Sequence, residues 1–119
     1  EQASILYIQV SPEESRRKNE ARANPKDPGS ILHHGVPRAV MYMEYGCDDI
    51  DWLLKKSDTP NTVCINAHGK TYHLPIGRFD NNDDKTTFTH QEQASWKQED
   101  VSKLHVALKS AFEPLVKNT

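Results

Sequence analysis

The sequence predicts a small α/β fold in which a partial or small sheet is flanked by helices. Three observations predict this class. A short apolar run near residues 4–10 has the composition of a strand. Two apolar runs near residues 62–76 face each other across a turn, as in a β-hairpin. After residue 95, apolar side chains recur at three- and four-residue steps, which predicts a long amphipathic C-terminal helix.

The composition limits the size of the core and the classes of partner. The chain of 119 residues has room for a single domain, or is a fragment of a larger α/β domain. Apolar and aromatic residues make up 35% of it, charged residues 27%, and the mean hydropathy is −0.80, so we expect a thin core. The net charge of −2 and the pI near 6.3 argue against nucleic acid and membrane surfaces as partners.

Cysteine usage and the chain start indicate the cellular setting. Cys47 and Cys64 build no disulfide framework, although a single bridge between them remains open. The sequence contains no apolar signal segment and no membrane-spanning run, which predicts a reducing, cytoplasmic location. The chain begins at Glu1 and reaches strand-like sequence within a few residues, as a piece of a longer protein would.

The first element is the run SILYIQV at residues 4–10. Its nearly continuous apolar character, with β-branched and aromatic residues, predicts a strand that is buried on both faces. Such a strand needs neighbours, and the rest of the chain offers only one further strand pair. We therefore expect partner strands from a missing upstream half, from another subunit or from a swapped copy.

A basic helix follows this strand. Ser11 is its predicted N-cap and Pro12 its first-turn proline, and two glutamates follow in the first turn, where the helix dipole favours negative charge. The helix is expected to run to about Ala23, before the turn residues Pro25, Pro28 and Gly29. It displays a block of cations made of Arg16, Arg17, Lys18 and Arg22. These cations form either a phosphate clamp at the carboxyl end of a strand or a solvated helix face.

The run SPEESRRKNEARANPKDPGSILHHGVP at residues 11–37, together with YGCDDIDW at residues 45–52, resembles the lid-side half of P-loop kinase-like proteins. The resemblance covers roughly residues 5–52. It implies a lid helix whose arginines close over transferred phosphates, a nucleotide or phosphorylated small molecule as ligand, and ATP with Mg as cofactors. Nothing in the chain matches G-x-x-x-x-G-K-[ST], so phosphoryl transfer is implied only if an upstream phosphate-binding loop is supplied.

Carried over to this sequence, the resemblance implies two groups of site residues. The candidate phosphate contacts are Arg16, Arg17, Arg22 and Lys26. The adjacent His33 and His34 would lie near the substrate pocket. Two neighbouring histidines alone are weak evidence for a metal site, and we predict none.

Residues 36–56 allow two interpretations. The favoured one is a pair of short helices broken at Gly46, the second capped by Asp48 or Asp49 and burying its apolar residues Trp52, Leu53 and Leu54. The alternative is a strand over AVMYMEY, whose side chains alternate between faces.

The C-terminal half contains the hairpin, a polar loop and the last helix. Gly69 supplies a positive φ angle in the hairpin turn at residues 67–70. Residues 79–93 are expected to be polar loop, and the acidic cluster at 81–84 within it is interpreted as solvated loop rather than a cation site. Ser95 with Gln98 predicts a capping box, and Pro114 should bend or end the helix. The predicted apolar stripe of this helix is Val101, Leu104, Leu108, Phe112 and Leu115.

Three functions remain open, so the sequence leaves enzyme status undecided. The first is the phosphate or nucleotide module described above. The second is a small non-catalytic binding or regulatory protein that docks its strand edge and C-terminal helix on a partner. The third is a cysteine hydrolase in which Cys47, at a helix N-terminus, is the nucleophile and His68 the base.

Overall fold

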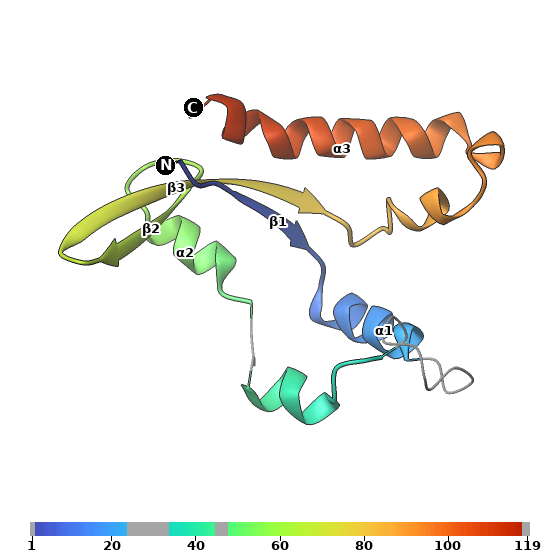
Figure 1. Cartoon of the computed structure of the whole chain (residues 1–119), viewed down its shortest axis with the longest axis horizontal. Helices are drawn as coiled ribbons and strands as arrows, with labels where there is room; N and C mark the ends of the chain where they lie inside the picture. The colour runs from blue at the N-terminus through green and yellow to red at the C-terminus, as the bar shows by residue number, and fades with distance from the viewer. Residues whose placement is uncertain (1, 24–33, 45–47, 118–119) are drawn as a thin grey trace. The chain divides into compact units, whose positions relative to one another are not determined.

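The computed structural model describes residues 2–23, 34–44 and 48–117. The chain divides into two compact units, one made of Glu1–Gln9 with Ile50–Thr119 and the other of Val10–Asp49. The predicted α/β class is confirmed, because the first unit combines a small mixed sheet with flanking helices, the longest of them at the C-terminus (Figure 1).

The sheet contains β1 (Ile5–Gln9), β2 (Thr62–Ala67) and β3 (Lys70–Asp80), in the order β1-β3-β2. β2 pairs antiparallel with residues 70–75 of β3, and β1 pairs parallel with residues 76–80. The two partner strands therefore pair with different halves of β3, and they do so at its two opposite edges. The described sheet is only two strands wide along most of its length, and each half of β3 keeps one edge without a described partner strand.

The β-hairpin is confirmed, with its turn at His68 and Gly69. Both residues have positive φ angles, 52° and 71°, as both central residues of a type I′ turn do. His68 lies at the exposed tip. The second hairpin strand is longer than the sequence indicated, since β3 continues past residue 76 to Asp80 in order to pair with β1.

The strand β1 is confirmed, but the expectation that both its faces are buried is wrong. Its side chains alternate: Ile5 and Tyr7 are half-buried, whereas Leu6 is 42% and Ile8 61% exposed. The strand that pairs with β1 is β3 of the same chain. The composition alone could not separate a buried strand from an edge strand, because the difference depends on which helix covers each face.

The helix α2 (Ile50–Lys56) covers one face of the sheet. The buried residues there are Ile50, Val63 and Ile76, and Ile5, Tyr7, Leu53 and Leu54 pack against them. The expected burial of Trp52 is wrong: it is 55% exposed, and the Nζ of Lys56 lies 4.4 Å from its ring centroid. A helix this short buries one face, and the i, i+3, i+4 spacing of the packed residues leaves Trp52 outside it.

The helix α3 (Gln98–Lys117) packs on the opposite face, where it lies mainly along β3 (Figure 1). Phe79, Ala111 and Leu115 are buried between strand and helix. Two members of the predicted stripe, Leu108 and Phe112, are instead 37% and 45% exposed. The helix contains Pro114 and continues past it to Lys117.

The predicted capping box before α3 is wrong. Ser95 belongs to a 3₁₀ helix at Gln93–Ser95, and its hydroxyl lies 2.7 Å from the carbonyl oxygen of Glu92. A further 3₁₀ helix spans Thr87–His90, so the polar segment between β3 and α3 contains two short helical turns.

The unit Val10–Asp49 contains α1 (Pro12–Arg22), which begins as predicted. The Ser11 hydroxyl accepts a hydrogen bond of 3.1 Å from the Glu14 amide. The Asn19 amide group donates to the carbonyl of Val36 at 2.8 Å and accepts from its N–H at 2.6 Å, fixing the returning chain against α1. A π-helix follows at Val40–Glu44 in place of the alternative strand, and the expected break at Gly46 lies outside the described residues.

Candidate functional site

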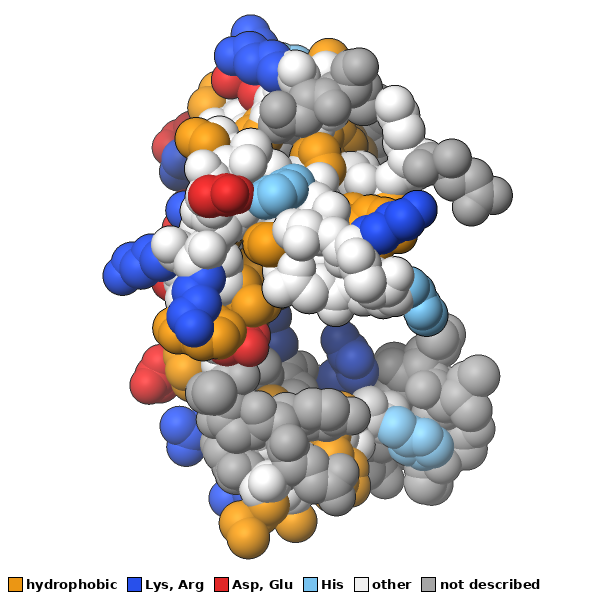
Figure 2. Space-filling model, turned by 90° about the vertical axis from the view of Figure 1, so that its left-hand side faces the viewer, with side chains coloured by type: hydrophobic (Ala, Val, Ile, Leu, Met, Phe, Trp, Pro, Cys, Tyr) orange, Lys and Arg blue, Asp and Glu red, His pale blue; other side chains and the backbone are white. Residues whose placement is uncertain are grey.

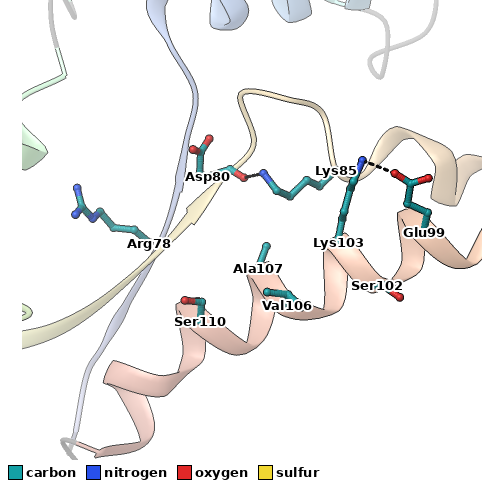
Figure 3. Close-up of a pocket in the computed structure, with 9 residues that line it drawn as sticks. All are labelled: Arg78, Asp80, Lys85, Glu99, Ser102, Lys103, Val106, Ala107 and Ser110. Atoms are coloured by element: carbon teal, nitrogen blue, oxygen red, sulfur yellow. Dashed lines mark hydrogen bonds and ion pairs between the residues drawn. The ribbon is translucent and has the colours of Figure 1, made fainter.

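A groove of about 570 Å³ runs between the C-terminal half of β3 and α3. Arg78 and Asp80 contribute from β3, and Ala107 and Ser110 point from α3 toward the strand (Figure 3). A second hollow of about 320 Å³ shares Arg78 and Ser110 with the groove. Both hollows lie within the sheet-containing unit, along residues 76–80 of β3, where β2 no longer pairs with this strand.

The backbone of β3 presents hydrogen-bonding groups at this edge. The Ile76 N–H donates to the carbonyl of Asn61, on the β2 side, whereas the Asn81 N–H donates to the carbonyl of Gln9, on the β1 side. Because the backbone groups of successive strand residues alternate between edges, Arg78 and Asp80 direct theirs to the same side as Ile76. The groove is thus bordered by a strand edge for which the described residues supply no pairing strand.

Ion pairs hold the cations around the groove. Arg78 binds Asp51 at 2.8 Å. Lys103 binds Glu99 at 3.1 Å, as Figure 3 shows. Lys85 donates to the Asp80 carbonyl at 2.8 Å and also pairs with Asp83.

These ion pairs shift two pKa values. The hydrogen bond from Lys85 holds the pKa of Asp83 below its ordinary range, and the hydrogen bond to Glu99 raises the pKa of Lys103. The three groove cations are therefore engaged by acidic groups of the same unit, and the rim carries charges of both signs.

A polar turn after β3 positions Lys85. The side chain of Asn81 is buried, at 5% exposure, so the interpretation of residues 81–84 as solvated loop is wrong for Asn81, whereas Asn82 and Asp83 are exposed. Its Oδ1 accepts from the Lys85 N–H at 2.7 Å and its Nδ2 donates to the Thr86 hydroxyl at 3.2 Å. The sequence did contain a sign of this role, because asparagine and aspartate side chains in turns commonly form hydrogen bonds with the turn backbone.

The sequence-predicted phosphate contacts lie elsewhere. Arg16, Arg17 and Arg22 are exposed on α1, and Arg17 forms hydrogen bonds of 2.8 and 2.5 Å with Glu14. Neither hollow includes these arginines. On the face shown in Figure 2, Lys and Arg side chains are scattered among hydrophobic and acidic ones.

The remaining predicted site residues are only partly described. Lys26, His33 and Cys47 lie outside the described residues, and His34 is exposed. Cys64 carries a half-buried free thiol. In the described ranges, no cluster of three or more His, Cys, Asp or Glu side chains is arranged to hold a metal ion.

Together the fold and the groove define a small α/β module with an open strand edge. Comparisons with protein-family models, with curated proteins and with solved structures found no match to this chain. No helix in the described part of the chain has the length and apolar character needed to cross a membrane.

Proposed function

We propose that this protein is a non-catalytic binding module that takes an extended polypeptide segment into the groove between β3 and α3. The observation that carries the proposal is the uncovered edge of β3 within a groove of about 570 Å³. A bound segment would add a strand at residues 76–80, where β2 no longer pairs with β3.

The chemistry of this edge selects a peptide backbone. Arg78 offers one outward N–H and one outward C=O, and an extended chain carries the same two groups at the matching spacing. The Asp80 carbonyl already accepts from Lys85, so the bonds centre on Arg78. The ion pairs around the rim limit affinity for a simple polyanion, because their acidic partners already neutralise the cations.

One side of the bound segment would face α3. Val106 is 65% exposed there, and the half-buried Ala107 leaves space beside β3. Alternate side chains of a strand point to the same face, so every second residue of the segment would contact this helix surface. We therefore expect a preference for a small or medium apolar side chain at one position, with little selection at its neighbours.

Phage-displayed random dodecapeptides, selected on the whole chain, provide the test. Selected peptides should protect the amide protons of Arg78 and Asp80 from exchange, as measured by NMR. The decisive variant is Arg78→Pro, which removes the outward N–H, and its matched control is Arg78→Ala, which keeps it. Both variants lose the ion pair with Asp51, so this loss cancels when the two are compared.

We expect Arg78→Pro to weaken peptide binding about tenfold relative to Arg78→Ala, the effect of losing roughly one hydrogen bond. Equal affinities would refute strand addition at this edge. The proposal also fails if selection returns no peptide that protects the Arg78 amide.

A phosphate-ligand role for α1 stays a second proposal. It is favoured by the exposure of Arg16, Arg17 and Arg22 on a single helix. Titration of ATP, and separately of inorganic phosphate, should show weaker binding to the Arg16→Ala, Arg17→Ala double variant than to the unaltered chain. Equal binding would exclude these side chains as phosphate contacts.

A further inference from the structure

The outer edge of β1 carries none of the charges or prolines that commonly prevent edge strands from pairing. Residues 2–10 contain no charged residue, no proline and no glycine. Natural edge strands are commonly protected by charges, prolines or bulges. The open edge of β3, in contrast, is flanked by the ion-paired Arg78 and Lys85.

The backbone of β1 has a defined outward set of donors and acceptors. The Gln9 carbonyl accepts from Asn81, so Gln9 faces β3. By alternation Ile5 and Tyr7 also face β3, whereas Leu6 and Ile8 direct their N–H and C=O groups to the outer edge. These two residues are also the exposed apolar ones of the strand.

Two apolar residues of α3 lie on the same side of the sheet. Ser110 lies on the flank of α3 that lines the groove. Leu108 and Phe112 are each two residues from Ser110, which is about 200° around the helix, so they lie on the opposite flank. This places them on the β1 side, above the face to which Leu6 points from its position opposite Gly77. The resulting apolar strip comprises Leu6, Ile8, Leu108 and Phe112.

We propose that a second copy of this chain pairs with β1 in antiparallel orientation, about a two-fold axis at Tyr7. In this register Leu6 lies opposite Ile8 of the second copy, and Ile8 lies opposite its Leu6. Because both residues have outward backbone groups, each such pair exchanges two hydrogen bonds. The most exposed apolar side chains of β1 then cover each other, and the sheet becomes continuous across the dimer.

The self-complementarity of the strand selects a second copy over another partner. In a two-fold interface the same surface of both copies is in contact, so a residue lies opposite either the same residue or a nearby residue of the second copy. Reversal of β1 about Tyr7 exchanges Leu6 with Ile8 and Ile5 with Gln9, and no charge meets a like charge. A strip of four apolar side chains per copy is small compared with stable dimer interfaces, so we expect reversible association.

Sedimentation velocity of the whole chain, from about 1 μM to about 1 mM, measures this association. The unaltered chain should show a concentration-dependent dimer. Leu6→Lys and Ile8→Glu should each raise its dissociation constant about tenfold or more, since each places a charge opposite an apolar side chain twice per dimer. Ile65→Lys is the matched control: Ile65 is 40% exposed on β2, at the other end of the strand order, and should leave the dissociation constant unchanged.

Mixing the two variants tests the register. In a mixed dimer the two substituted side chains lie opposite each other with opposite charge, while the other Leu6–Ile8 pair stays intact. The mixture should therefore form dimers at a concentration where each variant alone is monomeric. Failure of the mixture to dimerise overturns the register, and a monomeric unaltered chain at about 1 mM overturns the proposal.

A cross-link provides a measurement that does not depend on the charged variants. Tyr7 would face itself in a non-hydrogen-bonded pair, with Cα atoms about 4.5 Å apart, within the range that a disulfide spans. Tyr7→Cys, with both native cysteines changed to serine, should give a covalent dimer on mild oxidation. Ile65→Cys in the same background should not, and equal cross-linking of both variants would overturn the assignment to β1.

Discussion

Replacement of Gly77 by alanine tests how α3 is seated on the sheet. A Cβ atom at residue 77 would lie 1.7 Å from the carbonyl oxygen of Ala111, half of the 3.4 Å at which ordinary contact begins. The obstacle is backbone, so no rotamer change relieves it and the helix must move away from β3. Overpacking alone costs about 1–3 kcal/mol, and retreat of the helix also uncovers Phe79 and Leu115.

We therefore expect Gly77→Ala to lower the free energy of unfolding by about 3 kcal/mol, which corresponds to roughly 10 °C in melting temperature for a chain of this length. Thermal and urea unfolding, followed by circular dichroism, measure both quantities. Gly69→Ala is the control: it meets no atom within 4 Å and is disfavoured only by its φ of +71°, at about 1 kcal/mol. If Gly77→Ala melted no lower than Gly69→Ala, close helix–strand contact would be refuted.

Four further substitutions test individual buried and exposed contacts. Ile50→Ala should destabilise the fold by about 2–5 kcal/mol, whereas Trp52→Ala should cost less than about 1 kcal/mol, and a reversal in urea unfolding would refute the assigned α2 face. Asn81→Ala should lower the free energy of unfolding by about 1–3 kcal/mol, because it leaves the turn amide of Lys85 without its acceptor; unchanged urea unfolding would contradict this. Asp58 forms a hydrogen bond of 2.6 Å with His73, and this bond, followed by the charge attraction between the two groups, holds the pKa of Asp58 below 3.8. The pair therefore contributes to stability above pH 3.8, and this contribution is lost as the pH falls through the lowered pKa that Asp58 has in the folded protein. An NMR titration should show the Asp58 midpoint rising toward 3.8 in His73→Ala, which removes both the hydrogen bond and the charge, and an unchanged midpoint would argue against this pair.

Local patterns were sufficient to predict most of the elements. The Ser11 cap with its proline and two glutamates located the start of α1, and a glycine between two apolar runs located the hairpin turn. These features depend on neighbours within a few residues, so one sequence contains the information. The apolar steps near the C-terminus likewise gave the helix α3, although not which of its flanks is covered.

Features that depend on distant segments were not predicted. The exposure of Ile8 and Phe112 follows from the position of α3 over β3, a contact between elements that residues 81–97 separate in the sequence. Gly77 is the residue that permits this contact, and nothing around it in the sequence marks it as a contact position. The groove was missed for the same reason, because it exists only where β2 ends and β1 pairs on the other edge of β3.

The staggered pairing of β3 explains why the two proposed interfaces differ in partner. Each half of β3 has one described neighbour, and two of the sheet edges left open differ in character: the one beside Arg78 is charged and the one at β1 is uncharged. Pairing of the charged edge with its own copy would bring ion-paired side chains into a shared interface and cost their hydration. The uncharged edge at β1 has no such cost. Its sequence also stays mostly apolar and uncharged when the strand is reversed to pair with a second copy. A peptide at β3 and a second copy at β1 could therefore bind the same sheet together, and Arg78→Pro should weaken the peptide without changing the dimer dissociation constant.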